Sequence, residues 1–126
     1  MKTVIRTPDA PAAVGPYSQA IALNDFLFCA GQIPLDPVSG DLVAGGITAQ
    51  ATRVLDNVKA VLAANGMTFA DVVKSTVFMI DLGEFSAMNA VYSQYFAEPF
   101  PARSTIQVAA LPRGASVEIE VIAARP

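Results

Sequence analysis

Residues 71–108 decide the fold of this chain, and they read DVVKSTVFMIDLGEFSAMNAVYSQYFAEPFPARSTIQV. The segment from 71 to 80 is rich in β-branched and aromatic residues, which favour a strand. Apolar residues then recur at helical spacing from Phe85 to Phe96, and the prolines at 99 and 101 end this helix. Residues 104–108 form the next strand. A strand–helix–strand segment of this kind predicts two parallel strands joined by a right-handed crossover.

The rest of the chain supplies four more strands. They are predicted at residues 3–5, 17–23, 26–30 and 116–124, separated by turn residues. The run 26–30 is continuously apolar, which is typical of a strand covered on both faces. The last strand instead alternates apolar and polar residues, so its two faces differ.

A long amphipathic helix is predicted from Ile47 to the stop signal Asn65-Gly66. Its apolar residues fall on one stripe at i, i+4, i+7, i+8, i+11, i+14 and i+15: Ile47, Ala51, Val54, Leu55, Val58, Val61 and Leu62. Its polar residues are predicted on the opposite side: Gln50, Arg53, Asp56, Asn57 and Lys59.

The predicted order is therefore β-β-β-α-β-α-β-β, within one domain spanning residues 1–126. Two helices cannot cover both faces of a six-stranded sheet. We therefore expect an α+β fold with a mixed sheet and both helices packed on one face. The bare face would be buried by a neighbouring copy of the chain.

Composition also points to self-association. Of the 126 residues, 53% are hydrophobic and only 15% are charged, with a mean hydropathy of +0.46. A domain this small has much surface and little interior, so this apolar excess predicts a homo-oligomer. No apolar run approaches the roughly 20 residues that cross a bilayer, which argues against a membrane protein.

Charge and targeting signals narrow the classes of function. The net charge is −3 and the pI about 4.7, without the basic stripe of a nucleic-acid-binding protein. The first residues lack the apolar stretch of a signal peptide. Cys29 is the only cysteine, so no internal disulfide can form. We expect a cytoplasmic protein that does not bind nucleic acid.

Histidine is absent from the sequence. Its absence removes Ser-His-Asp and Cys-His mechanisms and the commonest zinc ligand. No metal site is expected. Any chemistry must use arginine, carboxylates, hydroxyl groups, the backbone and water.

Arg103 is the first candidate for a binding residue, because a guanidinium matches a planar carboxylate with parallel N–H donors. Thr105 lies two residues further on and shares its face. Glu118 and Glu120 likewise share one face of the last strand, so we expect an arginine and a carboxylate on a common wall. The alternatives are a surface arginine at a strand start and a solvated outer face for the two glutamates.

Four further residues have a functional and a structural interpretation. Tyr17 follows Gly-Pro and either lies over a pocket or packs ordinarily. Gly31 allows close approach to the backbone or simply ends a strand. Asn89 falls within the second helical stripe and either ties down a loop or lines a pocket. Cys29 lacks a nearby base and is interpreted as core.

Six motifs occur in order along the chain: APAAVGPYSQ at 10–19, CAGQIP at 29–34, LDNV at 55–58, KSTVF at 74–78, FPARS at 100–104 and VEIE at 117–120. Together they resemble the Rid (YjgF/YER057c) family, and most of all its RidA branch of 2-iminobutanoate/2-iminopropanoate deaminases. The resemblance covers essentially the whole chain.

This resemblance implies a chorismate-mutase-like fold and a homotrimer with sites in the clefts between subunits. It implies cofactor-free hydrolysis of 2-aminoacrylate, 2-aminocrotonate and their imines, which detoxifies reactive intermediates. It places the substrate carboxylate on Arg103 and the reactive water beside Glu118. The family's pocket tyrosine, glycine and asparagine correspond to Tyr17, Gly31 and Asn89.

The sequence departs from the family pattern at Ala30, where a serine is common, and at Thr105, where a cysteine is common. The Thr105 backbone or hydroxyl group could add a hydrogen bond to the substrate. These departures bear on substrate preference more than on the class of reaction. A non-catalytic regulator that binds small carboxylates, or a ribonuclease or translation inhibitor, remain the alternatives.

Overall fold

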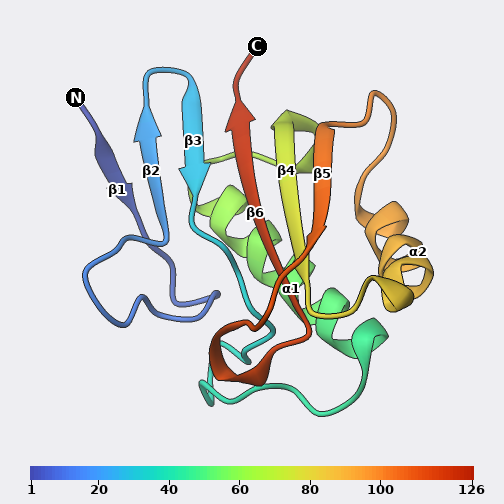
Figure 1. Ribbon diagram of the computed structural model, residues 1–126. Helices are drawn as coiled ribbons and strands as arrows, with labels where there is room; N and C mark the ends of the chain where they lie inside the picture. The colour runs from blue at the N-terminus through green and yellow to red at the C-terminus, as the bar shows by residue number, and fades with distance from the viewer.

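The computed structural model describes residues 1–126, and its helices and strands follow the predicted order (Figure 1). Three single-turn 3-10 helices also occur, at Phe69–Asp71, Leu82–Glu84 and Pro112–Gly114. The strands are β1 Thr3–Ile5, β2 Ala20–Leu23, β3 Phe26–Cys29, β4 Val72–Met79, β5 Ala102–Gln107 and β6 Val117–Ala124; the α-helices are α1 Ile47–Ala64 and α2 Phe85–Tyr95.

The six strands form one mixed sheet in the order β1-β2-β3-β6-β4-β5. The segment β4-α2-β5 joins parallel neighbours, as residues 71–108 predict. The last strand, β6, lies between β3 and β4 and is antiparallel to both. The α+β fold with a mixed six-stranded sheet is therefore confirmed.

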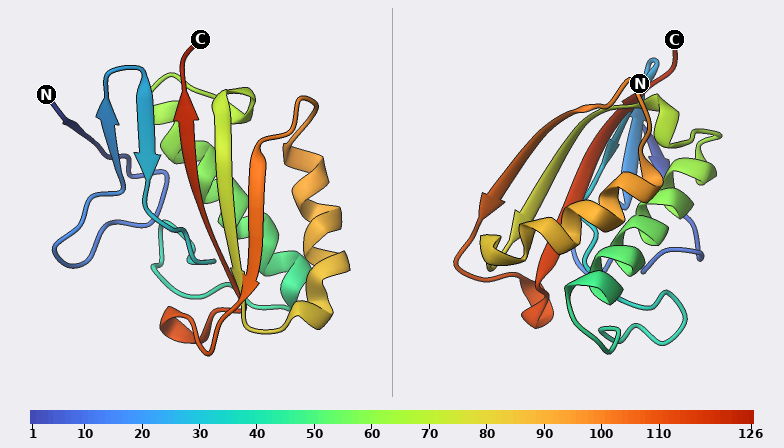
Figure 2. Two further views of the ribbon diagram at one scale, coloured as in Figure 1. Left: turned by 45° about the horizontal axis from the view of Figure 1, so that its top comes forward. Right: turned by 90° about the vertical axis from the view of Figure 1, so that its right-hand side faces the viewer.

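Both helices pack on the same face of the sheet (Figure 2). The apolar stripe of α1 is buried there with the inward residues of β4 and β6, in one cluster of 23 core residues. The helix ends where Gly66 adopts a φ of +69°, a conformation that favours glycine. No helix in the chain combines the length and apolar character needed to span a bilayer.

The prediction that all polar residues of α1 lie opposite its apolar stripe is wrong for Gln50 and Asn57, which are buried. The Gln50 side-chain oxygen accepts a hydrogen bond of 2.8 Å from the backbone N–H of Ser116. The Asn57 amide donates to the carbonyl of Leu35 at 3.0 Å. Loops cover this flank of the helix, and helical periodicity alone cannot foresee such loops.

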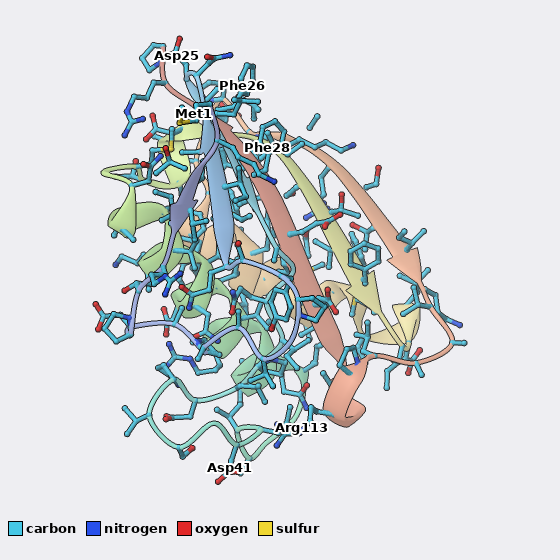
Figure 3. All side chains as sticks on the ribbon, turned by 90° about the vertical axis from the view of Figure 1, so that its left-hand side faces the viewer. Met1, Asp25, Phe26, Phe28, Asp41 and Arg113 are labelled. Carbon is cyan, nitrogen blue, oxygen red and sulfur yellow. The ribbon has the colours of Figure 1, made fainter.

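The other face of the sheet is open in the single chain, so β3 is covered on one face only. Phe26 and Phe28 are 45% and 43% exposed, with their ring centroids 6.0 Å apart. Figure 3 shows both rings on the side of the sheet away from α1. Val4 and Ile106, whose strands form opposite edges of the sheet, are also exposed. The predicted cover on both faces is absent from the isolated chain.

Two strand boundaries shift residues of interest. The second strand begins at Ala20 rather than at residue 17, so Tyr17 lies in a turn closed by its own N–H and the Gly15 carbonyl. Strand β5 begins at Ala102, earlier than predicted. Arg103 is therefore inside a hydrogen-bonded strand, which fixes its backbone more firmly than a junction would.

Candidate functional site

The side chain of Arg103 extends from β5 toward α2 and contacts its side chains. Its Nη1 group donates a hydrogen bond of 2.8 Å to the side-chain oxygen of Asn89. The centre of the guanidinium lies 4.6 Å from the Tyr92 ring centroid and 5.5 Å from that of Phe85. Cation–π contacts of this length attract the guanidinium to the rings. Asn89 therefore anchors the Arg103 side chain, and no hydrogen bond ties it to a loop.

The aromatic partners of Arg103 were not predicted from the sequence. Phe85, Asn89 and Tyr92 are spaced i, i+4 and i+7, so they line one face of α2. The Tyr92 hydroxyl in turn lies 2.7 Å from the hydroxyl of the fully buried Ser75. The sequence does carry one signal of this arrangement, because the polar Asn89 interrupts an aromatic stripe. That Arg103 is the partner of Asn89 could not be predicted without the pairing of β5.

None of these partners of Arg103 carries a negative charge. An amide oxygen and two aromatic rings orient the guanidinium without neutralising it. A guanidinium has five N–H donors, and Asn89 uses one nitrogen only. Thr105 is half-buried on the same face of β5, two residues along. This half of the site can accept a small carboxylate.

Glu118 lies on the open face of β6 and packs directly on Gly31. A methyl group at Gly31 would lie 2.8 Å from the Glu118 carboxyl carbon and would overlap one of its oxygens. The close-approach interpretation of Gly31 is therefore the one the structure supports, since it is space rather than backbone conformation that requires glycine. The backbone of Gln32 pairs with Ile119 and holds the two segments in register.

The Glu118 carboxyl is half-buried, and this burial raises its pKa above the ordinary value for glutamate. The negative charge of Glu120, two residues further along the same face, raises this pKa further. A carboxyl group with a raised pKa holds its proton closer to neutral pH. It is therefore suited to donate and accept protons in a reaction.

The expected common wall of Arg103 and the glutamates is wrong within one chain. Arg103, Ser75 and Val121 form one cross-strand row, and Ser75 and Val121 are buried under the helices. Glu118 is in the row of Phe78 and therefore on the other face. Side chains alternate between faces along a strand, so strand proximity does not bring these two together.

Tyr17 belongs to the loop beside Gly31. The buried Gln19 amide ties this loop, donating to the Pro11 carbonyl at 2.8 Å and accepting from the Thr7 N–H at 2.7 Å. The Gln19 carbonyl accepts from the backbone N–H of Ala30 at 2.9 Å. Tyr17 is 55% exposed and lines a pocket of about 440 Å³. Gln19 thus holds this loop in place, a role that the sequence pattern does not indicate.

Cys29 is core, as predicted. Burial raises the pKa of its thiol to about 12, so the reactive thiolate does not form near neutral pH. No group of three or more carboxylate or thiol side chains is arranged to hold a metal ion.

The predicted residues thus form two groups. Arg103, Asn89 and Thr105 gather on the helix-covered face at β5, and we call them the clamp. The second group consists of Glu118, Gly31 and the adjoining loop that carries Tyr17. We call this second group the carboxyl group site.

Comparison with known proteins identifies the class. The family described as Endoribonuclease L-PSP matches residues 7–125. The chain belongs to this family, which is also called Rid or YjgF.

The chain is similar to a 2-iminobutanoate/2-iminopropanoate deaminase of Capra hircus, with 50% identity over 98% of this chain and 90% of that protein. Among solved structures, it is similar to a Rid family protein of unknown function from Yersinia pestis, with a TM-score of 0.96 and 50% identity, covering 99% of this chain and 100% of that one. It is also similar to E. coli TdcF with bound serine, with a TM-score of 0.93 and 43% identity, covering 98% and 99%.

Proposed function

We propose that this protein is a deaminase that hydrolyses reactive 2-imino and enamine acids to 2-keto acids and ammonia. The observation that carries the proposal is Arg103, whose guanidinium is held by uncharged partners and keeps donors for a carboxylate. A similar deaminase and a similar structure with bound serine support a ligand of amino-acid size. No cofactor is required by this chemistry.

The active unit we propose is a homotrimer with its sites between subunits. The clamp and the carboxyl group site lie on opposite faces of one sheet, so one chain cannot present both to a small substrate. The clamp of one subunit facing the carboxyl group site of the next would complete the cleft. The exposed apolar residues of the open face support such burial against a neighbouring copy.

The reaction adds one water and releases one ammonia. Arg103 holds the substrate carboxylate and places the imine carbon beside the neighbouring subunit's carboxyl group site. Glu118 in its acid form protonates the imine nitrogen, and water adds to the carbon as its proton passes to the Glu118 carboxylate. That proton then moves to the amine nitrogen of the carbinolamine. The C–N bond breaks with loss of ammonia, and the hydroxyl proton passes to the Glu118 carboxylate, which gives the keto acid and restores the acid form of Glu118.

Tyr17 and Thr105 would line the two sides of this cleft and shape the space for the substrate side chain. Thr105 offers a hydroxyl donor beside Arg103. Ala30 offers no side-chain hydrogen bond next to Gly31. We propose that Thr105 and Ala30 set the preference among short-chain imino acids. The expected substrates are 2-aminoacrylate, 2-aminocrotonate and their imines.

The test is a coupled assay in which threonine dehydratase generates the imine and 2-ketobutyrate formation is followed. The wild-type protein should accelerate ketobutyrate formation beyond spontaneous hydrolysis. Arg103→Ala should lower kcat/KM by about 10² or more, because truncating one partner of a buried charge pair costs several kcal/mol. Arg103→Lys keeps the charge but loses the planar fork, and should recover only part of the activity.

The matched control is Arg125→Ala. Arg125 hydrogen-bonds the Asn65 carbonyl at the end of α1, outside both halves of the site. It should leave activity unchanged. Binding of 2-keto acids without any acceleration by the wild type would favour the non-catalytic regulator. RNA cleavage that survives Arg103→Ala and falls steeply with salt would favour the ribonuclease.

A further inference from the structure

The open face carries a second carboxylate to which the proposed reaction assigns no role. Glu120 follows Glu118 by two residues on β6, so the two side chains stand on the same face about 7 Å apart along the strand. Both residues are half-buried. Two carboxylates this close on a partly desolvated surface disfavour each other's ionised form.

The neighbouring strands leave Glu118 without a cation. Its cross-strand partner on β4 is Phe78, and the segment on its other side presents Gly31. Glu120 faces Thr76 on β4. Neither β4 nor the segment at Gly31 therefore places a positive charge directly beside Glu118.

Lys74 is the cation of β4 on this face, and its position is not symmetric between the two glutamates. Lys74 pairs with Ile122, which is two residues from Glu120 and four from Glu118. Lys74 and Glu120 line one cavity of about 200 Å³. The ammonium group donates to the Ser104 hydroxyl at 3.3 Å. The positive charge of Lys74 therefore lies on the Glu120 side of the pair and away from Glu118.

We propose that Glu120 is a positioning residue for the reaction, and that its carboxylate keeps the catalytic proton on Glu118. This inference rests on the proposed role of Glu118 as proton donor. Lys74 lies on the Glu120 side of the pair, so no cation of this chain offsets the charge of Glu120 at Glu118. The negative charge of Glu120, together with the burial of Glu118, disfavours the ionised form of Glu118. Burial and the charge of Glu120 both raise the pKa of Glu118, which agrees with this role.

The test is Glu120→Gln, which removes the charge and keeps the shape. The Glu118 carboxyl is titrated by carbon-13 NMR in protein labelled at glutamate, with Glu118→Gln assigning the resonance. The pH–rate profile is recorded in the coupled assay. In Glu120→Gln, both the titration and the alkaline limb of the rate profile should move to lower pH. Each unit of such a shift lowers the protonated fraction above the pKa about tenfold.

Two further variants separate charge from shape. Glu120→Asp keeps the charge, so its titration and rate profile should return toward the wild type. Lys74→Met removes the opposite charge and should not move the Glu118 titration to lower pH. A packing effect alone would spare Glu120→Gln, which keeps the shape, and would appear in Glu120→Asp, which is one methylene shorter.

An unchanged Glu118 titration in Glu120→Gln, or one that moves to higher pH, would overturn the inference. A titration that moves without any change in the rate profile would overturn the catalytic use of the pair. Failure of the proposed function gives a different pattern. The wild type would then show no acceleration in the coupled assay, whatever the titration of Glu118.

Discussion

The two halves of the candidate site differ in what surrounds their charged groups. In the clamp, Arg103 is positioned by a hydrogen bond to Asn89 and by an aromatic ring on α2, under the helix layer. In the carboxyl group site, Glu118 rests on bare backbone at Gly31, on a face that no helix covers. The first arrangement fixes a binding group, and the second partly desolvates a proton-carrying group. The binding and proton-transfer roles that we propose thus fall on opposite faces of one sheet.

Glu118→Gln should have the largest effect on the proton-transfer half. It removes the group that carries the proton while preserving size, so kcat should fall by about 10²–10⁴ with little change in KM. Steady-state kinetics in the coupled assay give the two parameters separately. A rise in KM with kcat unchanged would show that Glu118 acts in substrate binding. It would contradict the assignment of binding to the clamp and proton transfer to the carboxyl group site.

Gly31→Ala should come next. The added methyl group would overlap the Glu118 carboxyl and push it from its position. A displacement near 1 Å is expected to lower kcat by about 10². Gly46→Ala, at a glycine with a negative φ whose added Cβ would meet nothing, controls for glycine loss itself and is judged by activity per folded molecule. Equal losses in the two variants would contradict the proposed contact.

Asn89→Ala should weaken the clamp more modestly. Hydrogen bonds to charged groups contribute about 1.5–3 kcal/mol, and the aromatic contacts of Arg103 remain, so KM should rise about tenfold. Ser93→Ala, on an exposed turn of the same helix, is the control. A loss confined to kcat would mean that Asn89 does not act through substrate binding.

The smallest expected effect concerns stability. The pKa of Glu118 is raised in the folded protein, so the folded state binds this proton more tightly than the unfolded chain. The resulting stabilisation is complete below the unfolded pKa and is lost as pH rises through the folded pKa. Glu118→Gln should therefore unfold at a higher temperature than the wild type above that range, measured by calorimetry across pH. Glu98→Gln, at an exposed glutamate, is the control. If the unfolding temperature of the wild type rose relative to that of Glu118→Gln with increasing pH, the predicted sign would be wrong.

Sequence patterns predicted the elements and their order because these depend on local periodicity. The stripe of α1 and the alternation of β6 are of this kind, and both match the buried residues. The contact of Gly31 with Glu118 was predicted in part. The sequence indicated that a glycine at the end of this strand allows another group to approach the backbone closely, but it did not name Glu118.

The relation between Arg103 and Glu118 could not be predicted in this way. It depends on the register of β5 on β4 and of β4 on β6, which places Arg103 in the row of Ser75 and Val121. Register is set by contacts between distant segments. The same limit applies to Gln19, whose partners lie 8 to 12 residues earlier in a loop without periodicity.

The most direct test of a cleft built from two subunits is to mix two inactive variants. Arg103→Ala and Glu118→Gln are unfolded together at equal concentration, refolded, and assayed beside each variant refolded alone. Random assembly pairs an intact Arg103 of one subunit with an intact Glu118 of its neighbour in about one quarter of the clefts. We predict about one quarter of wild-type activity in the mixture. Activity no greater than that of the separate variants would contradict a site shared between subunits.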